Sequence, residues 1–100
     1  MLVLPAELTH AQAQTCLNML LQAARAAAEP QVLVDASALT RFDSSALAVL
    51  LACRREALHE GRGFAVRGLA PRLRELARLY GVSALLPDPA APEDEVLAAA

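Results

Sequence analysis

Three consecutive polar residues, Asp43, Ser44 and Ser45, carry the side chains best placed for chemistry in this sequence. They end a loop that follows the apolar run closed by Asp35, and they precede an apolar stretch with helical spacing. In open α/β sheets, sites usually form where a strand ends and the next helix begins. The first turn of that helix leaves backbone N–H groups unpaired, and its dipole favours negative charge. A carboxylate or a phosphate is therefore stabilised here.

Spacing alone leaves two interpretations of this helix start open. In the first, Asp43 or Ser44 is only the N-cap, which stabilises the first turn. In the second, Ser44 is a regulated hydroxyl, because a phosphate there would add roughly −1.5 to −2 charge at a surface that a partner must cover. Asp35 and Asp43 would repel that phosphate, while the helix N-terminus would hold it. In the second interpretation, phosphorylation of Ser44 would switch partner binding on or off.

Catalysis is not the chemistry that we expect from these residues. Ser44 with His10 or His59 would suggest a hydrolase, but no Gly-x-Ser-x-Gly turn surrounds the serine. A Gly-x-x-x-x-Gly-Lys loop is absent as well, so we do not expect nucleotide hydrolysis. Cys16 and Cys53 lie in apolar stretches and are expected to be buried, reduced thiols rather than metal ligands. The sequence predicts a non-enzymatic protein without cofactors or metals.

Length and charge exclude further classes of protein. The 100 residues can build one hydrophobic core but not two. The net charge is −2, and no cationic cluster of the kind that binds nucleic acid is present. The longest strongly apolar run, 46–53, is far shorter than the about 20 residues that span a bilayer. We expect a cytoplasmic protein without membrane insertion, with the acidic residues 88–100 as a flexible tail.

The elements that position the site follow from hydrophobic periodicity and turn residues. Strands are predicted over residues 1–4, 31–35 and 64–67, with a short edge strand over 84–86. Helices are predicted over residues 10–28 with Thr9 as N-cap, over 44–60, and from Pro71 to a C-cap at Gly81, with Tyr80 facing inward. Residues 36–43 are expected to be a connection. This order predicts an α/β domain whose small mixed sheet carries its helices mainly on one face.

The segments around the site resemble the STAS domain signature, a strand ending in Asp-x-Ser followed by Asp-[Ser/Thr]-x-Gly-Leu at a helix start. The matching residues are 32–35 and 43–51. Residues 76–82 and 85–87 are similar to the closing segment of MlaB-like STAS subunits. The resemblance predicts a single STAS domain over residues 1–87.

The chain departs from the family pattern at two places. Ala46 replaces the usual Gly of the signature, which weakens any argument from close backbone approach. Met1 falls at what resembles the family's second strand, so we expect one edge strand fewer or a different start codon.

The resemblance implies a module that docks onto a partner protein, with the family's functional hydroxyl at Ser44. In MlaB-like subunits this position engages the ATPase of an ABC phospholipid transporter, which acts with its permease to maintain outer-membrane lipid asymmetry. That reading places the chain in the cytoplasm, peripheral to the inner membrane through the complex. In anti-sigma-factor antagonists the same position is phosphorylated by a serine-kinase anti-sigma factor, so Ser44 would be the phosphoacceptor. The implied contact surface comprises Asp43, Ser44, Ser45 and Ala46.

Arginines on two predicted helices are further candidates for partner contacts. Arg54 projects near the apolar arc of its helix, so either its stem lies along the core edge with the charge in water, or that edge belongs to the partner-binding surface. Arg72, Arg74 and Arg78 of the third helix form a solvated face that could also meet acids on a partner.

Overall fold

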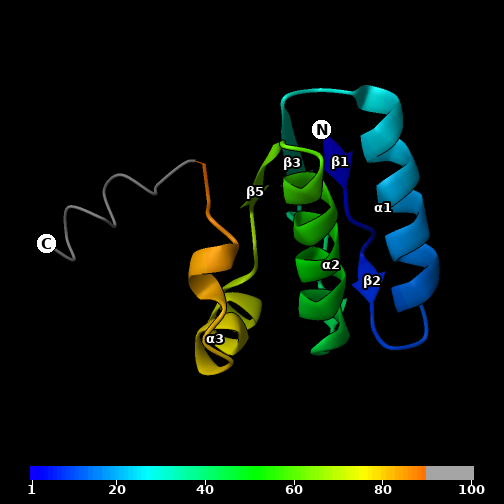
Figure 1. The fold of residues 1–100 in the computed structure, drawn as a ribbon. Coiled ribbons are helices and arrows are strands. Elements are labelled where there is room, and N and C mark those ends of the chain that lie inside the picture. Colours follow the sequence, from blue (N-terminus) through cyan, green and yellow to red (C-terminus); the bar gives the residue numbers. More distant parts are fainter. Residues whose placement is uncertain (90–100) are drawn as a thin grey trace, which may run out of the picture.

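Three parallel strands form the main sheet, in the order β1–β3–β5 (Figure 1). The computed structural model describes residues 1–89, with strands β1 (Leu2–Val3), β3 (Gln31–Asp35) and β5 (Gly63–Arg67). The central strand spans the residues predicted from its Val-Leu-Val run. Its Val34 pairs with a residue of β1 on one side and a residue of β5 on the other.

A second pair of short strands lies beside the site. Strands β2 (Glu7–Leu8) and β4 (Arg41–Phe42) pair in parallel, and the Ala6 carbonyl accepts hydrogen bonds from the N–H groups of Thr40 and Arg41 at 2.9 and 3.0 Å. The prediction that residues 36–43 form a connection without secondary structure was wrong at β4. A strand of two residues is too short to show an alternating hydrophobic pattern in the sequence. All strand pairs found in residues 1–89 are parallel, whereas we expected a mixed sheet.

Helices α1 (Ala13–Ala27) and α2 (Ser45–His59) lie side by side over one face of the main sheet (Figure 1). Helix α3 (Pro71–Leu79) lies on the side of α2 away from α1. In β3, Val32 and Val34 are buried beneath the helices, while the alternate residues Leu33 and Asp35 are only half-buried on the opposite face. The α/β class with helices mainly on one face is confirmed.

The start of α1 differs from its prediction. The helix begins at Ala13 instead of residue 10, and its N-cap residue is Gln12 rather than Thr9. Thr9 donates from its backbone N and its Oγ1 to the Gln12 side-chain carbonyl at 2.9 and 2.7 Å. These hydrogen bonds to the Gln12 side chain close a separate turn before the helix. Residues 9–12 are therefore not part of α1.

The end of the described chain also differs from the sequence-based prediction. Tyr80 is 60% exposed rather than inward-facing, because α3 ends one residue earlier and Gly81, at φ 74°, turns the chain as predicted for a C-terminal glycine. The expected strand over 84–86 is instead a 3₁₀ helix, η1 (Ser83–Leu85). The edge of β5 is covered by the next residues, where the Pro87 carbonyl accepts a hydrogen bond from Val66 N–H at 2.9 Å.

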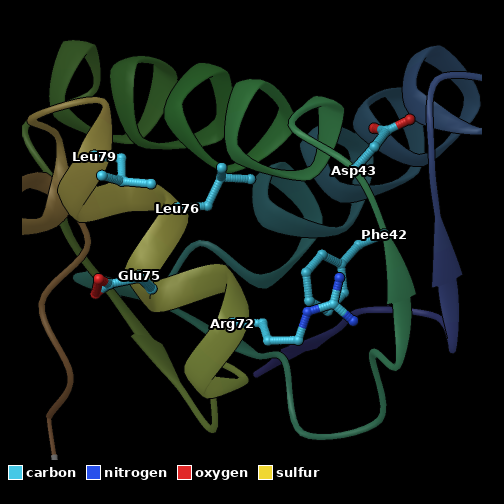
Figure 2. A pocket seen from close by; sticks show the side chains of 6 residues that line it. All are labelled: Phe42, Asp43, Arg72, Glu75, Leu76 and Leu79. Atoms are coloured by element: carbon cyan, nitrogen blue, oxygen red, sulfur yellow. The ribbon is translucent and has the colours of Figure 1, made fainter.

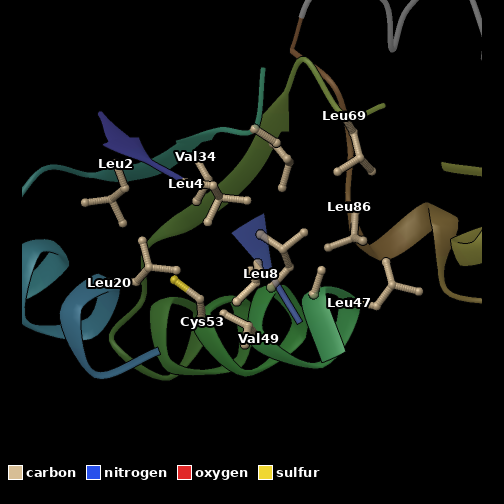
Figure 3. Close-up of a cluster of buried hydrophobic side chains, with 14 of the residues drawn as sticks. Leu2, Leu4, Leu8, Leu20, Val34, Leu47, Val49, Cys53, Leu69 and Leu86 are labelled. Atoms are coloured by element: carbon tan, nitrogen blue, oxygen red, sulfur yellow. The ribbon is translucent and has the colours of Figure 1, made fainter. Parts of the chain in front are cut away.

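The core lies between the main sheet and its helices and consists almost entirely of aliphatic side chains (Figure 3). Leu20 from α1 and Cys53 from α2 point toward Leu2 and Val34 of the sheet. The prediction of two buried, unpaired thiols is confirmed, and burial raises the pKa of Cys53 to about 11. Among residues 1–89, no helix is long and apolar enough to cross a membrane.

Candidate functional site

Asp43 is the residue that caps helix α2 with its side chain. Its Oδ1 accepts a hydrogen bond from Ser45 N–H at 2.8 Å, and its Oδ2 accepts one from His10 N–H at 3.1 Å. The bond from Ser45 N–H, followed by that from His10 N–H, lowers the pKa of Asp43 below its ordinary value. The carboxylate therefore stays ionised near neutral pH and ties the helix start to the turn before α1.

Ser44 occupies the N-cap position but does not cap. Its backbone is helical, at φ −63° and ψ −15°, and its side chain makes no capping hydrogen bond. The residue is exposed, and its hydroxyl has no hydrogen-bond partner among residues 1–89. Of the two interpretations drawn from spacing, the capping role falls to Asp43, and the hydroxyl of Ser44 is left facing solvent.

Ser45 and Ala46 continue the helix in different environments. Ser45 is half-buried and donates its N–H to the Asp43 carboxylate. Ala46 is completely buried, at 0% exposure, and packs in the hydrophobic core. We therefore place Ala46 beneath the surface that a partner could touch, because its position at the first turn points its methyl group toward the sheet. The other members of the predicted set, Asp43, Ser44 and Ser45, lie together at the helix start.

Arg54 lies two turns further along α2 and is half-buried. Its neighbours at helical spacing are Leu51, which is half-buried, and Leu58, which is 46% exposed. No carboxylate of residues 1–89 lies at ion-pair distance from its guanidinium. The stem thus borders the core while the charge is not compensated within the described chain, which is compatible with both predicted roles.

A groove of about 340 Å³ opens next to the helix start, between the end of β4 and helix α3 (Figure 2). Its lining consists of Phe42, Asp43, Arg72, Glu75, Leu76 and Leu79. The Arg72 guanidinium lies 5.7 Å from the centre of the Phe42 ring, a cation–π distance. The sequence did not predict this groove, because its lining comes from β4 and α3, two segments that lie far apart in the chain.

Neither histidine is hydrogen-bonded to the Ser44 hydroxyl in the part of the chain that the structure describes. His59 is the last residue of α2, so it lies at the opposite end of the helix from Ser44, and His10 contacts the site through its backbone N–H. Residues 1–89 contain no group of three or more His, Cys, Asp or Glu side chains that could hold a metal ion.

Fold and site together define a small α/β module whose exposed features suit protein binding. A family model described as Mlab, STAS domain, matches residues 1–87, and the chain belongs to this family. STAS domains are in general non-catalytic regulatory or binding domains. No curated protein matches the chain.

Proposed function

We propose that this protein is the STAS subunit of an ABC phospholipid transporter that maintains outer-membrane lipid asymmetry. In this role it binds the transporter's ATPase subunit through the start of α2 and stabilises or regulates the complex with the permease. It would then lie in the cytoplasm, peripheral to the inner membrane through its partner. The observation that carries the proposal is the exposed Ser44 hydroxyl, which has no hydrogen-bond partner in the described chain.

The arrangement around Ser44 supports recognition by a protein. The Asp43 carboxylate is held by two backbone N–H groups, so the helix start is rigid before any partner arrives. A rigid site loses little conformational entropy on binding. The Ser44 hydroxyl can donate and accept a hydrogen bond to a partner without first breaking one in its own chain. Membership in the MlaB-type family supports an ATPase as that partner.

The rival proposal is an anti-sigma-factor antagonist whose Ser44 is phosphorylated by a serine-kinase anti-sigma factor. The same exposure that suits a partner contact also leaves the hydroxyl accessible to a kinase. A phosphate there would stand next to the ionised Asp43 and would disturb any interface that covers the helix start. Intact mass of the protein from native cells separates the proposals, because a gain of one phosphate mapped to Ser44 favours the rival.

The test is a native pull-down of tagged variants, with partners identified by mass spectrometry. We expect the wild type to retain an ABC ATPase with its permease, and Ser44→Glu to lose both while remaining folded by circular dichroism. The matched control is Thr15→Glu, which places the same charge at an exposed hydroxyl in the first turn of α1. A Ser44→Glu protein that still binds the ATPase normally would contradict the proposal, as would capture of a kinase-like anti-sigma factor in its place.

A further inference from the structure

Charge compensation is uneven over the surface of residues 1–89. Each acidic side chain in this part has a partner: six lie in ion pairs, and Asp35 and Asp43 accept hydrogen bonds from backbone N–H groups. In contrast, four arginines have no carboxylate at ion-pair distance within the described chain. These are Arg54, Arg55, Arg67 and Arg72.

Arg72 is the uncompensated charge that lies in the groove beside the proposed partner site. Of the two acids that line the groove with it, Glu75 pairs with Arg78 at 3.6 Å, and Asp43 is held by backbone N–H groups. The Phe42 ring supports the Arg72 guanidinium from one side. A guanidinium held in this way presents a planar pair of donors that matches a carboxylate.

The rest of the groove is apolar and partly exposed, since Phe42 and Leu76 are half-buried and Leu79 is exposed. Leu79 is 75% exposed, the highest value among the large hydrophobic side chains of the described chain. It rises from α3 beside Leu76, and both lie on the side of that helix that faces α2 (Figure 2). Together, Phe42, Leu76 and Leu79 give the groove a continuous apolar lining against which a partner can bury an anchor residue.

We propose that this groove binds an amphipathic helix of the partner protein, which places an apolar side chain against Phe42 and Leu79 and a carboxylate on Arg72. The inference rests on the proposed function, which supplies a protein partner at the start of α2, and it adds the chemistry of the segment that docks. A helix is favoured over an added strand because β4, the strand at this groove, is only two residues long. Helices dock in grooves through apolar residues three or four positions apart.

The first experiment is site-specific photo-crosslinking in the native cell, with a photoreactive amino acid in place of Leu79. The control position is Met19, which is exposed to a similar degree, at 62%, but belongs to α1. We expect the Leu79 probe to crosslink a partner segment with apolar residues at helical spacing and at least one Asp or Glu among them. No crosslink above the Met19 control, or a segment without acids or helical spacing, would overturn the inference.

The second experiment reverses the charge that recognises the partner. Binding of Arg72→Glu to the captured partner is expected to weaken about tenfold, with a reduced dependence on salt. The control is Arg55→Glu, because Arg55 also lacks an ion-pair partner in the described chain but is an exposed residue of α2 outside the lining of the groove. Equal affinities of the two variants would contradict the role of Arg72.

These outcomes separate the inference from the proposed function. If the Leu79 probe captures an acidic helix from a protein other than an ABC ATPase, the transporter assignment fails while the groove assignment stands. If the pull-down yields the ATPase but the Leu79 probe and the Arg72→Glu variant behave like their controls, the groove assignment fails and the transporter assignment stands.

Discussion

Just beyond the C-terminal end of α2, the polar side chain of Arg62 is bonded within the chain, whereas at the N-terminal end the hydroxyl of Ser44 has no partner among residues 1–89. Beyond the C-terminal end, Arg62 donates from Nε to the Glu29 carbonyl at 2.6 Å and from Nη1 to the Ala24 carbonyl at 2.8 Å. Its guanidinium also pairs with Glu60 at 3.3 Å, and only 11% of the side chain is exposed. At the N-terminal end, the hydroxyl of Ser44 has no such bond among residues 1–89.

The difference separates two tasks within one helix. Arg62 joins the end of α1 to the loop before β5, so it fixes the helix pair against the sheet and leaves little for a partner to bind. At the opposite end, the Asp43 carboxylate accepts the N–H groups of Ser45 and His10. This end borders a groove that contains an exposed Leu79 and an Arg72 without an ion-pair partner among residues 1–89. We infer that stability is concentrated at one end of α2 and recognition at the other.

Replacing Ser44 with Glu tests recognition, and we expect the largest effect, loss of the ATPase complex without loss of the fold, as set out above. Arg72→Glu follows, with an affinity about tenfold lower. Both variants should unfold at the same denaturant concentration as the wild type. A large loss of stability in either would show that the N-terminal end also holds the fold together.

Replacing Arg62 with Met tests stability at the other end. The variant keeps the aliphatic stem but removes the Arg62 hydrogen bonds to the carbonyl groups of Ala24 and Glu29, of which Ala24 keeps the N–H of Ala28. We expect the free energy of unfolding to fall by about 2 kcal/mol. Urea denaturation followed by circular dichroism measures the change. The control is Arg55→Met on the exposed face of α2, expected to change stability by less than about 0.5 kcal/mol. Equal effects of the two variants would contradict a special role for Arg62.

Replacing Asp43 with Ala tests whether the carboxylate charge stabilises the N-terminal end of α2, because that contribution to stability depends on pH. The pKa of Asp43 is lowered in the folded protein, so its contribution to stability is present above the unfolded pKa of about 3.9 and is lost as the pH falls through the folded pKa. We expect Asp43→Ala to melt below the wild type at pH 7 and the two melting temperatures to converge in acid. Thermal melts from pH 7 to pH 2 measure this. A difference that does not change with pH would mean that the carboxylate charge is not what caps the helix.

Replacing Ser44 with Ala is expected to have the smallest effect on the fold. Because the hydroxyl makes no capping bond, the free energy of unfolding should change by no more than about 0.5 kcal/mol. Binding of the partner should nevertheless weaken, since the interface loses a hydrogen bond. Denaturation and affinity measurements on the same preparation check both statements. A marked loss of stability would assign the capping role to Ser44 after all.

The sequence by itself determined the elements whose signals are local. Strand β3 spans the residues that its apolar run predicted, α2 begins and ends within one residue of its predicted bounds, and Pro71 and Gly81 mark α3 as expected. These signals are local because helix periodicity, proline and glycine act through neighbouring residues. The same reasoning placed Asp43, Ser44 and Ser45 at a helix start, whereas the family followed from the resemblance of the surrounding segments to the STAS signature and from the family model that matches residues 1–87.

Only the tertiary structure decided which of these residues caps the helix and which is left for a partner. Asp43 caps by accepting the N–H of Ser45, and its second carboxylate oxygen accepts the N–H of His10, a residue 33 positions away in the chain. The groove lies between Phe42 at the end of β4 and the Arg72 side of α3, two segments that are far apart in the sequence. Such contacts join segments that are distant in the sequence, and hydrophobic periodicity carries no information on them. Periodicity could therefore predict the helix start, but not which of its residues caps the helix and which stays exposed.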